Sequence, residues 1–140
     1  MELTDVKHCK PGWTMFGDSC YLFGDTDMTF YSALEYCEGL DATLVHINTT
    51  DENLFLKTEL MQKPNSPKHW IGMTDEAEEG TWTYLDGVNV SFTHWGTSQP
   101  NNGQASNCGA FWASFDYMWV DESCTRTFKA ICEGGAIFTC

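Results

Sequence analysis

A chain of 140 residues that is 42% apolar and 14% aromatic is large enough to bury a core, which argues against a disordered chain. Its 20 acidic and 7 basic residues give a formal net charge of -13, which repels phosphate backbones and anionic headgroups. We therefore expect no nucleic acid partner and no membrane insertion.

Two helices are predicted in the first half of the chain. Residues 29–40 repeat apolar side chains at three- and four-residue steps, the spacing of one helical face. A second helix begins where Thr49 and Glu52 have the spacing of a capping box, in which each residue pairs with a backbone N–H of the other. Pro64 and Pro67 end this helix, because proline lacks the N–H that a helix interior requires.

Strands are predicted in the second half. After His69, short aromatic and β-branched runs separated by Asp, Asn and Gly predict strands at residues 70–73 and 81–84, and residues 128–133 predict a final strand. Residues 93–117 are rich in Asn, Gly, Ser and Gln and show no clear period. Long loops in compact domains are usually functional, so we expect the binding site there.

Seven cysteines are too many to stay reduced in a small acidic domain without metal-type Cys-x-x-Cys pairs, so we expect disulfides and an oxidising compartment. No apolar run is long enough to span a membrane, and residues 1–5 are too polar for a signal peptide. We interpret the chain as a mature secreted, extracellular protein. N-glycosylation sequons at Asn48 and Asn89 agree with secretion, although such triplets also arise by chance.

A series of motifs runs in order along almost the whole chain. They are Cys9-x-x-Gly12-Trp13, Cys20-Tyr21, Ala42-x-Leu44-x-x-Ile47, Trp70-Ile71-Gly72-Met73, Glu79-Gly80-x-Trp82, Gln99-Pro100-Asn101, Trp119-x-Asp121 and Ile131-Cys132-Glu133. In this order they resemble the C-type lectin-like domain family. The resemblance implies an α+β fold in which two helices flank antiparallel sheets and a long upper loop region carries the ligand. It also implies a single domain over residues 1–140, with an amino-terminal hairpin included.

The cysteine count alone leaves many pairings open. The family resemblance implies three intrachain disulfides, Cys9–Cys20, Cys37–Cys132 and Cys108–Cys124. Cys140 is then left over, and a leftover cysteine in a secreted chain predicts an interchain bridge and hence a disulfide-linked dimer. The alternative is a free or capped thiol at the chain end.

The same resemblance bears on the sugar site. In sugar-binding members a calcium ion bridges protein oxygens to two neighbouring sugar hydroxyls, and the proline of the binding triplet is usually cis. The triplet Glu-Pro-Asn goes with mannose-type sugars and Gln-Pro-Asp with galactose-type sugars. Here Gln99-Pro100-Asn101 is a hybrid that selects neither.

The expected calcium ligands at this sugar site are incomplete. Ser106 stands where the family has a glutamate, and Val120 stands where it has an asparagine. Only Gln99, Asn101 and Asp121 remain, with one carboxylate among them. Calcium affinity follows the number and charge of the ligands, so we expect this ion to bind weakly or not at all.

Two further calcium positions follow from the resemblance. An auxiliary loop site matches Asp75 and Glu79 in part. Its other positions fall on Asn102, Ser106 and Asn107. A structural site matches Glu52 and Glu133 with a backbone carbonyl near His46, and this is where we expect calcium. The alternative is that Glu52 serves only its capping box and Glu133 is a solvated charge.

A sugar can also be held without the ion. Asn101 with Asp116 or Asp121, and Tyr117 or His94 stacked on the ring, would suit an acetamido group. We therefore favour an N-acetylhexosamine, GalNAc or GlcNAc, or a galactose-type sugar. Core packing is the alternative role of the nearby aromatic residues. These are Trp95, Phe111, Trp112, Phe115 and Trp119.

These patterns predict a lectin that binds terminal sugars of glycans or glycoproteins, and as a dimer it would agglutinate cells in defence. An enzyme is not expected, because the four histidines lack metal spacing and no Gly-x-Ser-x-Gly elbow occurs. The alternative function is a lectin-like domain that binds a protein, or ice, in place of sugar, because a fold does not determine a function.

Overall fold

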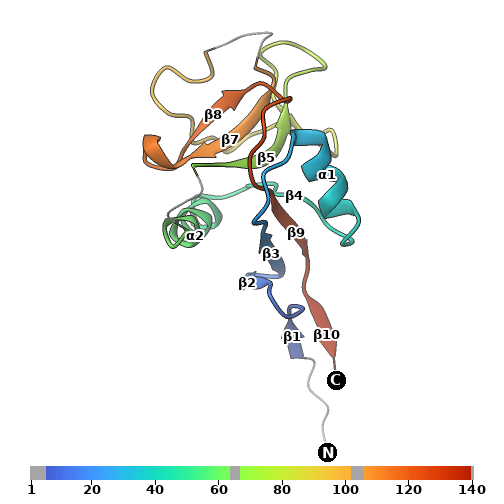
Figure 1. The fold of residues 1–140 in the computed structure, drawn as a ribbon. Coiled ribbons are helices and arrows are strands. Elements are labelled where there is room, and N and C mark those ends of the chain that lie inside the picture. Colours follow the sequence, from blue (N-terminus) through green and yellow to red (C-terminus); the bar gives the residue numbers. More distant parts are fainter. Residues whose placement is uncertain (1–5, 64–66, 102–105, 140) are drawn as a thin grey trace, which may run out of the picture.

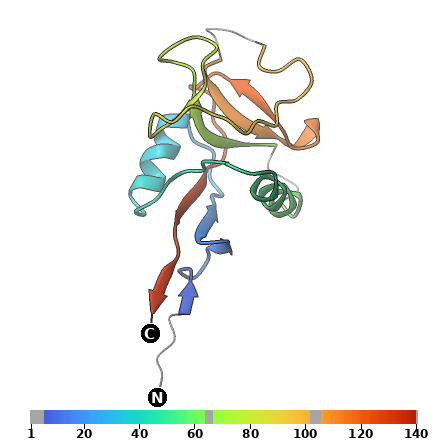
Figure 2. The ribbon, with the colours of Figure 1, turned by 180° about the vertical axis from the view of Figure 1, so that it is seen from behind.

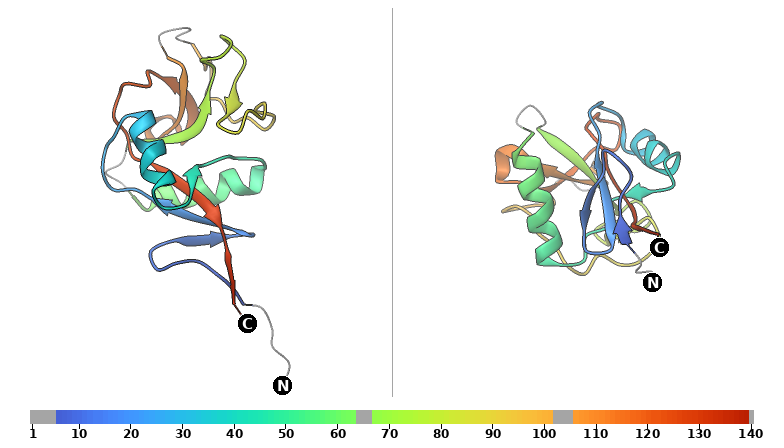
Figure 3. Two further views of the ribbon diagram at one scale, coloured as in Figure 1. Left: turned by 90° about the vertical axis from the view of Figure 1, so that its right-hand side faces the viewer. Right: turned by 90° about the horizontal axis from the view of Figure 1, so that it is seen from below.

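The computed structural model describes residues 6–63, 67–101 and 106–139, where the chain forms two α-helices, one short 3-10 helix and ten strands (Figure 1). In chain order they are β1 (Val6–His8), β2 (Thr14–Phe16), β3 (Ser19–Phe23), α1 (Phe30–Glu38), β4 (Thr43–Leu44), α2 (Thr50–Met61), β5 (Lys68–Thr74), β6 (Thr83–Tyr84), β7 (Cys108–Trp112), η2 (Ala113–Phe115), β8 (Met118–Glu122), β9 (Ile131–Gly135) and β10 (Ile137–Thr139). The helices α1 and α2 lie on opposite sides of the central strands when seen from the front, from behind and from below (Figures 1, 2 and 3). This is the predicted α+β architecture.

Both predicted helices form, and each begins at a threonine cap. The Thr29 hydroxyl accepts the N–H of Ser32 at 3.3 Å, and the Thr49 hydroxyl accepts the N–H of Glu52 at 3.1 Å. The return half of the capping box differs from the prediction. The Glu52 carboxylate accepts the N–H of Asn48 at 2.9 Å, one residue before the cap. Glu52 therefore ties the approach to α2 as well as its first turn.

The helix α2 buries only part of its apolar side chains. Leu56 and Leu60 are buried, whereas Leu54 is 58% exposed. The polar Asn53 completes the inward face, and its side-chain oxygen accepts the indole N–H of Trp119 at 2.9 Å. That bond satisfies both buried polar groups and joins the helix to the β5–β8 sheet.

The strands form two four-stranded sheets, in the orders β2-β3-β9-β4 and β6-β5-β7-β8, and one two-stranded sheet of β1 and β10. All of these neighbouring strands pair antiparallel. The strand predicted at residues 70–73 lies within β5, the one at 81–84 shortens to β6, and the one at 128–133 begins later, as β9.

The stretch at residues 93–117 is not one continuous loop, which corrects the prediction from sequence. Strand β7 occupies its middle, and η2 follows directly. The strand was hidden because β7 lies between β5 and β8 and four of its five residues are buried. A strand buried on both faces lacks the apolar–polar alternation by which strands are found.

The two larger sheets meet where β5 crosses β4. The Gly72 N–H donates to the Val45 carbonyl at 2.9 Å, and the Val45 N–H donates to the Ile131 carbonyl of β9 at 2.9 Å. A Cβ atom on Gly72 would lie 2.7 Å from the Leu44 carbonyl oxygen. Only glycine permits this close approach of the two backbones.

The core consists of two clusters of buried side chains. One contains Trp119, Phe111 and the inward face of α2, and Trp95 packs against it from the loop that precedes the triplet. The other contains Trp70 and the buried face of α1. Trp119, Phe111 and Trp95 therefore have the packing role that was the alternative to sugar contact.

Three disulfides close the fold as the family resemblance implied: Cys9–Cys20, Cys37–Cys132 and Cys108–Cys124. The Cys37–Cys132 bridge spans 95 residues of sequence, and in the chain-entropy account such a bridge stabilises the fold by roughly 4 kcal/mol. Cys140, predicted to join two chains, lies outside the described residues.

The first and last described strands, β1 and β10, pair at the end of the molecule opposite the β5–β8 sheet (Figures 1 and 2). This pair therefore lies far from the loops that precede β7 (Figures 1 and 2). Among the described helices none is long and apolar enough to cross a membrane.

Candidate functional site

The Gln-Pro-Asn triplet lies on the loop that runs beside β8. Trp95 forms a parallel bridge with Trp119 of β8, and the Gly96 N–H donates to the Trp119 carbonyl at 2.9 Å. The chain then turns, with the Gln99 N–H bonded to the Gly96 carbonyl at 2.9 Å. The Gln99–Pro100 peptide bond is cis, as the resemblance implied.

Asp121 holds this loop in place. It is 3% exposed near the end of β8, and its Oδ1 accepts the N–H of Asn101 at 3.1 Å. Its own N–H donates to the side-chain oxygen of Gln99 at 3.4 Å. The structure therefore brings together the three residues predicted to remain from the family's sugar site, and Asp121 is the link among them.

A depression of about 190 Å³ lies beside the triplet. Its lining consists of Asp75, Glu79, Gly80, Trp82, Pro100 and Asp121. The partial auxiliary site and the triplet site therefore share one depression, which sequence spacing did not reveal. The depression therefore has three carboxylates, from Asp75, Glu79 and Asp121, whereas Asp121 is the one carboxylate among the remaining ligands of the triplet site.

The electrostatics of this depression centre on two neighbouring carboxyls. Asp75 is 5% exposed and its Oδ2 accepts the N–H of Gly80 at 2.9 Å. A hydrogen bond between the Asp75 and Glu79 carboxyls raises the pKa of Glu79 above its ordinary value, and repulsion by the Asp75 and Asp121 charges acts in the same direction.

This arrangement only partly fits a calcium ion. Hard carboxylate oxygens are the ligands that calcium prefers, and the depression offers three such groups. Among the described residues, however, these three carboxylates do not lie within 4.8 Å of one another as a shared set of ligands. The oxygens of Asp121 and Gln99 are also engaged in holding the loop. The residues present therefore form no closed coordination shell around one ion.

The two replaced ligand positions are buried. Ser106 is 7% exposed, and Val120 is 2% exposed within the second core cluster. Val120 offers no side-chain oxygen to an ion, and its side chain packs in the core. This position has therefore lost its ligand and gained a packing role.

The other predicted sugar contacts lie elsewhere. Asp116 and Tyr117 form the turn between η2 and β8, and Asp116 pairs with Lys57 of α2 at 3.2 Å. From Tyr117 to Asp121 the chain runs four residues along β8, about 13 Å at the rise of a strand. His94 is half-buried, and its carbonyl accepts the N–H of Trp119. The residues predicted to hold the sugar therefore lie at opposite ends of the β7–β8 hairpin, with Asp116 and Tyr117 at its turn and Asp121 at its other end.

Two residues of the site were missed by sequence reasoning. Trp82 lines the depression, and its buried indole N–H has no hydrogen-bond partner in the described part of the chain. Phe115 packs its ring on Gly96, in space that a Cβ atom there would fill. Trp82 belongs to the motif Glu79-Gly80-x-Trp82, which identified the family but gave no indication of a place in the site. Nothing in the sequence signals the contact of Phe115 with Gly96.

The predicted structural calcium site brings Glu52 and Glu133 close to Tyr21. Glu52 accepts the Tyr21 hydroxyl at 2.5 Å, and Glu133 accepts the N–H of His46 at 3.1 Å and the Ser19 hydroxyl at 3.0 Å. Burial raises the pKa of Glu133 and also raises the pKa of Tyr21. Both carboxylates are satisfied by donors of the fold itself, and calcium binding here stays a prediction.

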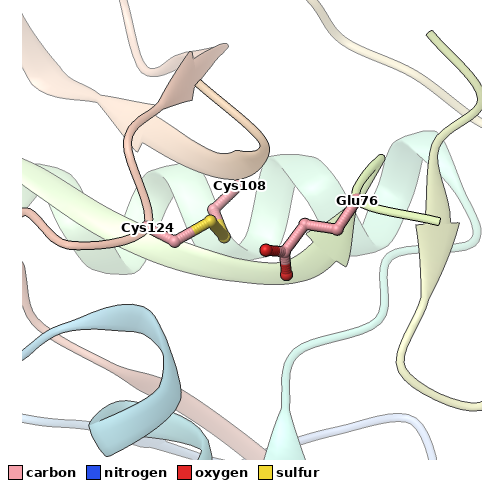
Figure 4. A group of neighbouring side chains, drawn as sticks. All are labelled: Glu76, Cys108 and Cys124. Carbon is pink, nitrogen blue, oxygen red and sulfur yellow. A yellow bond between two sulfur atoms is a disulfide. The ribbon is translucent and has the colours of Figure 1, made fainter. Parts of the chain in front are cut away.

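One further group of possible ligands is excluded by its chemistry. The Glu76 carboxylate lies beside Cys108 and Cys124 (Figure 4), but the two sulfurs are bonded to each other. Metals bind the thiolate, which a disulfide does not offer. Glu76 instead accepts the hydroxyl of Tyr31 and ties the loop after β5 to α1.

Residues 26–134 match the family model described as the lectin C-type domain. A perlucin-like protein of Mytilus galloprovincialis is 32% identical over 126 residues, which cover 88% of this chain and 80% of that protein. An alpha-N-acetylgalactosamine-specific lectin of Patiria pectinifera is 32% identical over 131 residues, covering 88% of this chain and 78% of that lectin. The chain therefore belongs to the C-type lectin family.

Solved structures agree on the fold. The mouse scavenger receptor C-type lectin carbohydrate-recognition domain superposes with a TM-score of 0.84 at 31% identity, covering 91% of this chain and 98% of that one. A calcium-independent type II antifreeze protein superposes with a TM-score of 0.84 at 28% identity, covering 94% and 98%. The SPL-1–GlcNAc complex superposes with a TM-score of 0.83 at 28% identity, covering 90% and 94%.

Proposed function

We propose that this chain is an extracellular lectin that binds terminal N-acetylhexosamine or galactose-type sugars at the depression beside Gln99-Pro100-Asn101. The observation that carries the proposal is the double tie of Asp121 to Gln99 and Asn101, which sets the triplet at the rim of a concave, polar depression. Concave sites with a few fixed polar groups are typical of small-ligand binding. Membership of a lectin family and a GalNAc-specific relative support the sugar class.

The sugar contacts in this proposal are direct. In this proposal the exposed Asn101 side chain pairs with an acetamido group or a hydroxyl, and Trp82 contributes part of the wall of the depression. Catalysis is not part of the proposal, because the arrangement binds and orients a ligand without an activated nucleophile.

Calcium has a supporting role in this proposal. The ion is proposed at Glu52 and Glu133, where it would be structural. Asp75 and Glu79 would supply two carboxylates of a partial second site. The sugar is held by Asn101 and its neighbours, so removal of calcium should weaken binding without abolishing it.

The test is to measure binding of GalNAc, GlcNAc, galactose and mannose by calorimetry, with and without a chelator. We expect at least about fivefold preference for an N-acetylhexosamine or galactose over mannose, about 1 kcal/mol. We expect Asn101→Ala to weaken binding at least tenfold and Gln62→Ala, which truncates an exposed amide after α2, to leave the sugar affinity unchanged. A strict preference for mannose that the chelator abolishes would contradict the proposal.

A second candidate function is binding of ice or of a protein. It is favoured by the incomplete calcium ligands together with the fold similarity to a calcium-independent antifreeze protein. A glycan array at high protein density separates the two candidates. No signal on the array, combined with thermal hysteresis or capture of a defined protein ligand, would replace the sugar proposal.

We also propose that Cys140 joins two chains into a dimer, with residues 1–140 as one domain in each. Three intrachain disulfides use six of the seven cysteines, which supports a bridge between chains. A dimer with two sugar sites would link glycans on two cells and agglutinate them.

A further inference from the structure

Two N-glycosylation sequons, distant in sequence, come to one face of the fold. Asn48-Thr49-Thr50 leads into α2, and Asn89-Val90-Ser91 follows β6. The acceptor asparagine and the hydroxyl residue of each sequon are exposed: Asn48, Thr50, Asn89 and Ser91. Sequon glycosylation needs such surface positions in the finished fold, because the attached sugar is bulky and hydrophilic.

A single tyrosine connects the two sequons in space. The Tyr84 hydroxyl donates to the Ile47 carbonyl at 3.0 Å and accepts the Ile47 N–H at 3.2 Å, immediately before Asn48. The Tyr84 N–H donates to the Val88 carbonyl at 2.9 Å, immediately before Asn89. The hydroxyl of Tyr84 thus bonds the residue before Asn48, and its backbone N–H bonds the residue before Asn89. Tyr84 therefore connects the two sequons.

The surface beside Tyr84 is hollowed and partly apolar. A groove of about 410 Å³ lies there, lined by residues that include Leu34 and Glu38 of α1, His46 and Leu85. His46 stacks on Tyr84 with ring centroids 3.7 Å apart. Leu85 and Val88 are 39% and 53% exposed. Leu85 lines the groove and Val88 directly precedes Asn89, so apolar atoms stand within reach of a sugar chain attached there.

We propose that Asn48 and Asn89 both carry N-linked glycans, and that the two glycans together cover this groove. In each transfer the asparagine Nδ2 forms a bond to the anomeric carbon of an oligosaccharide. The bond from that carbon to a lipid-linked pyrophosphate breaks, the lipid pyrophosphate leaves, and the amide loses one proton. The donor is thus a lipid-pyrophosphate-linked oligosaccharide of the secretory pathway.

This modified face is distinct from the proposed sugar site. None of the residues that line the groove lines the depression at Asp75, Glu79 and Asp121. The inference therefore stands or falls separately from the proposed function. Sugar binding should be the same in glycosylated and unglycosylated protein.

Occupancy is tested by expressing the full chain in secreting animal cells and measuring its intact mass before and after peptide N-glycosidase treatment. We expect two glycans on the unaltered chain, and one on each of the variants Thr50→Ala and Ser91→Ala. The matched controls Thr50→Ser and Ser91→Thr keep the sequons and should keep both glycans. A secreted chain with either asparagine unmodified would overturn the proposal.

The cover is tested by the rate at which diethyl pyrocarbonate modifies His46, followed by peptide mapping. We expect the rate to rise at least about threefold when the glycans are removed enzymatically from the folded, secreted protein, while the rate at His94 stays unchanged. Enzymatic removal avoids any need for the double variant to fold. Equal rates at His46 with and without glycans would overturn the covering role.

Discussion

At the scale of single residues, Asp121 has the most consequence for binding. It is buried, and its carboxylate accepts the Asn101 N–H in a bond that a smaller side chain would not replace, while its backbone N–H donates to Gln99. A hydrogen bond to a charged group contributes about 1.5–3 kcal/mol. The position of the triplet therefore depends on this one carboxylate.

We predict that Asp121→Ala weakens sugar binding by at least tenfold, because the loop loses the acceptor for the Asn101 N–H. The matched control is Asp116→Ala, which removes an exposed ion pair with Lys57 at the other end of the hairpin. Exposed pairs contribute at most about 1 kcal/mol, and sugar affinity should stay within twofold. If titration calorimetry gives the reverse order, the sugar lies at the hairpin turn with Tyr117.

His69 makes folding sensitive to acid. It is 2% exposed on β5, and burial, reinforced by the nearby Lys129 and Lys63, lowers its pKa from 6.5 to about 3, while Asp27 acts in the opposite direction. Below pH 6.5 the unfolded chain takes up a proton that the folded chain refuses. Stability should therefore fall as the pH drops from about 6.5 toward 3.

Between pH 7 and pH 4 the unaltered protein should lose about 3 kcal/mol of unfolding free energy through His69, because pH 4 lies about 2.5 pH units below the unfolded pKa of 6.5 and each unit contributes about 1.4 kcal/mol. We predict that the variant His69→Met does not show this loss. Urea denaturation of both proteins at the two pH values measures this difference. Comparing the two proteins cancels the contribution of Glu133, whose raised pKa acts in the opposite direction. Parallel pH profiles would show that His69 is not the acid-sensitive group.

At the scale of elements, the turn after β7 supports the triplet loop. The Phe115 ring of η2 packs on Gly96, and the loop continues from there to the cis proline. The two segments are remote in sequence, and their contact depends on the absence of a side chain at Gly96. This contact places the loop relative to the β7–β8 hairpin.

We predict that Gly96→Ala costs about 1–3 kcal/mol of folding stability, because the added methyl overlaps the Phe115 ring, and that it weakens sugar binding through the displaced loop. The double variant Gly96→Ala with Phe115→Leu should recover at least about 1 kcal/mol relative to the sum of the single changes. Thermal unfolding of the four proteins measures this coupling. Additive effects would mean that the contact does not place the loop.

The elements themselves were predictable where their patterns are local. The first helix was predicted from its apolar repeat and the second from the capping-box spacing of Thr49 and Glu52, and both helices form there. Strand β7 was not predictable because burial on both faces removes alternation. The burial of the polar Asn53 on α2 has no local signal in the sequence, because its hydrogen-bond partner is the remote Trp119.

At the scale of the whole molecule, β1 and β10 lie at the end of the fold away from the loops that precede β7 (Figure 3). The β1–β10 pair closes the end of the fold opposite the β5–β8 sheet, and Cys140 follows β10 directly in sequence. A bridge between two chains at this end would leave both sugar depressions accessible.

We predict that Cys140→Ser abolishes the disulfide-linked dimer on non-reducing gels and with it agglutination of glycan-bearing cells. The affinity for a single monosaccharide should stay within about twofold, because β10, which Cys140 follows in sequence, lies at the end of the fold opposite the β5–β8 sheet (Figure 1). The matched control is the unaltered chain with its thiol alkylated only after purification. A monomeric unaltered chain under oxidising conditions would contradict the dimer.

Sequence alone was sufficient for the family, the two helices, the three disulfides and the presence of the triplet, since each depends on local spacing or on an ordered set of motifs. The arrangement of the site required the tertiary structure. Pro100, Asp75 and Asp121 come from three separate segments, and only folding shows that they share one depression while Asp116 and Tyr117 lie at the far end of β8. The physical reason is that hydrogen bonds, charge repulsion and packing act across space, and their partners are distant along the chain.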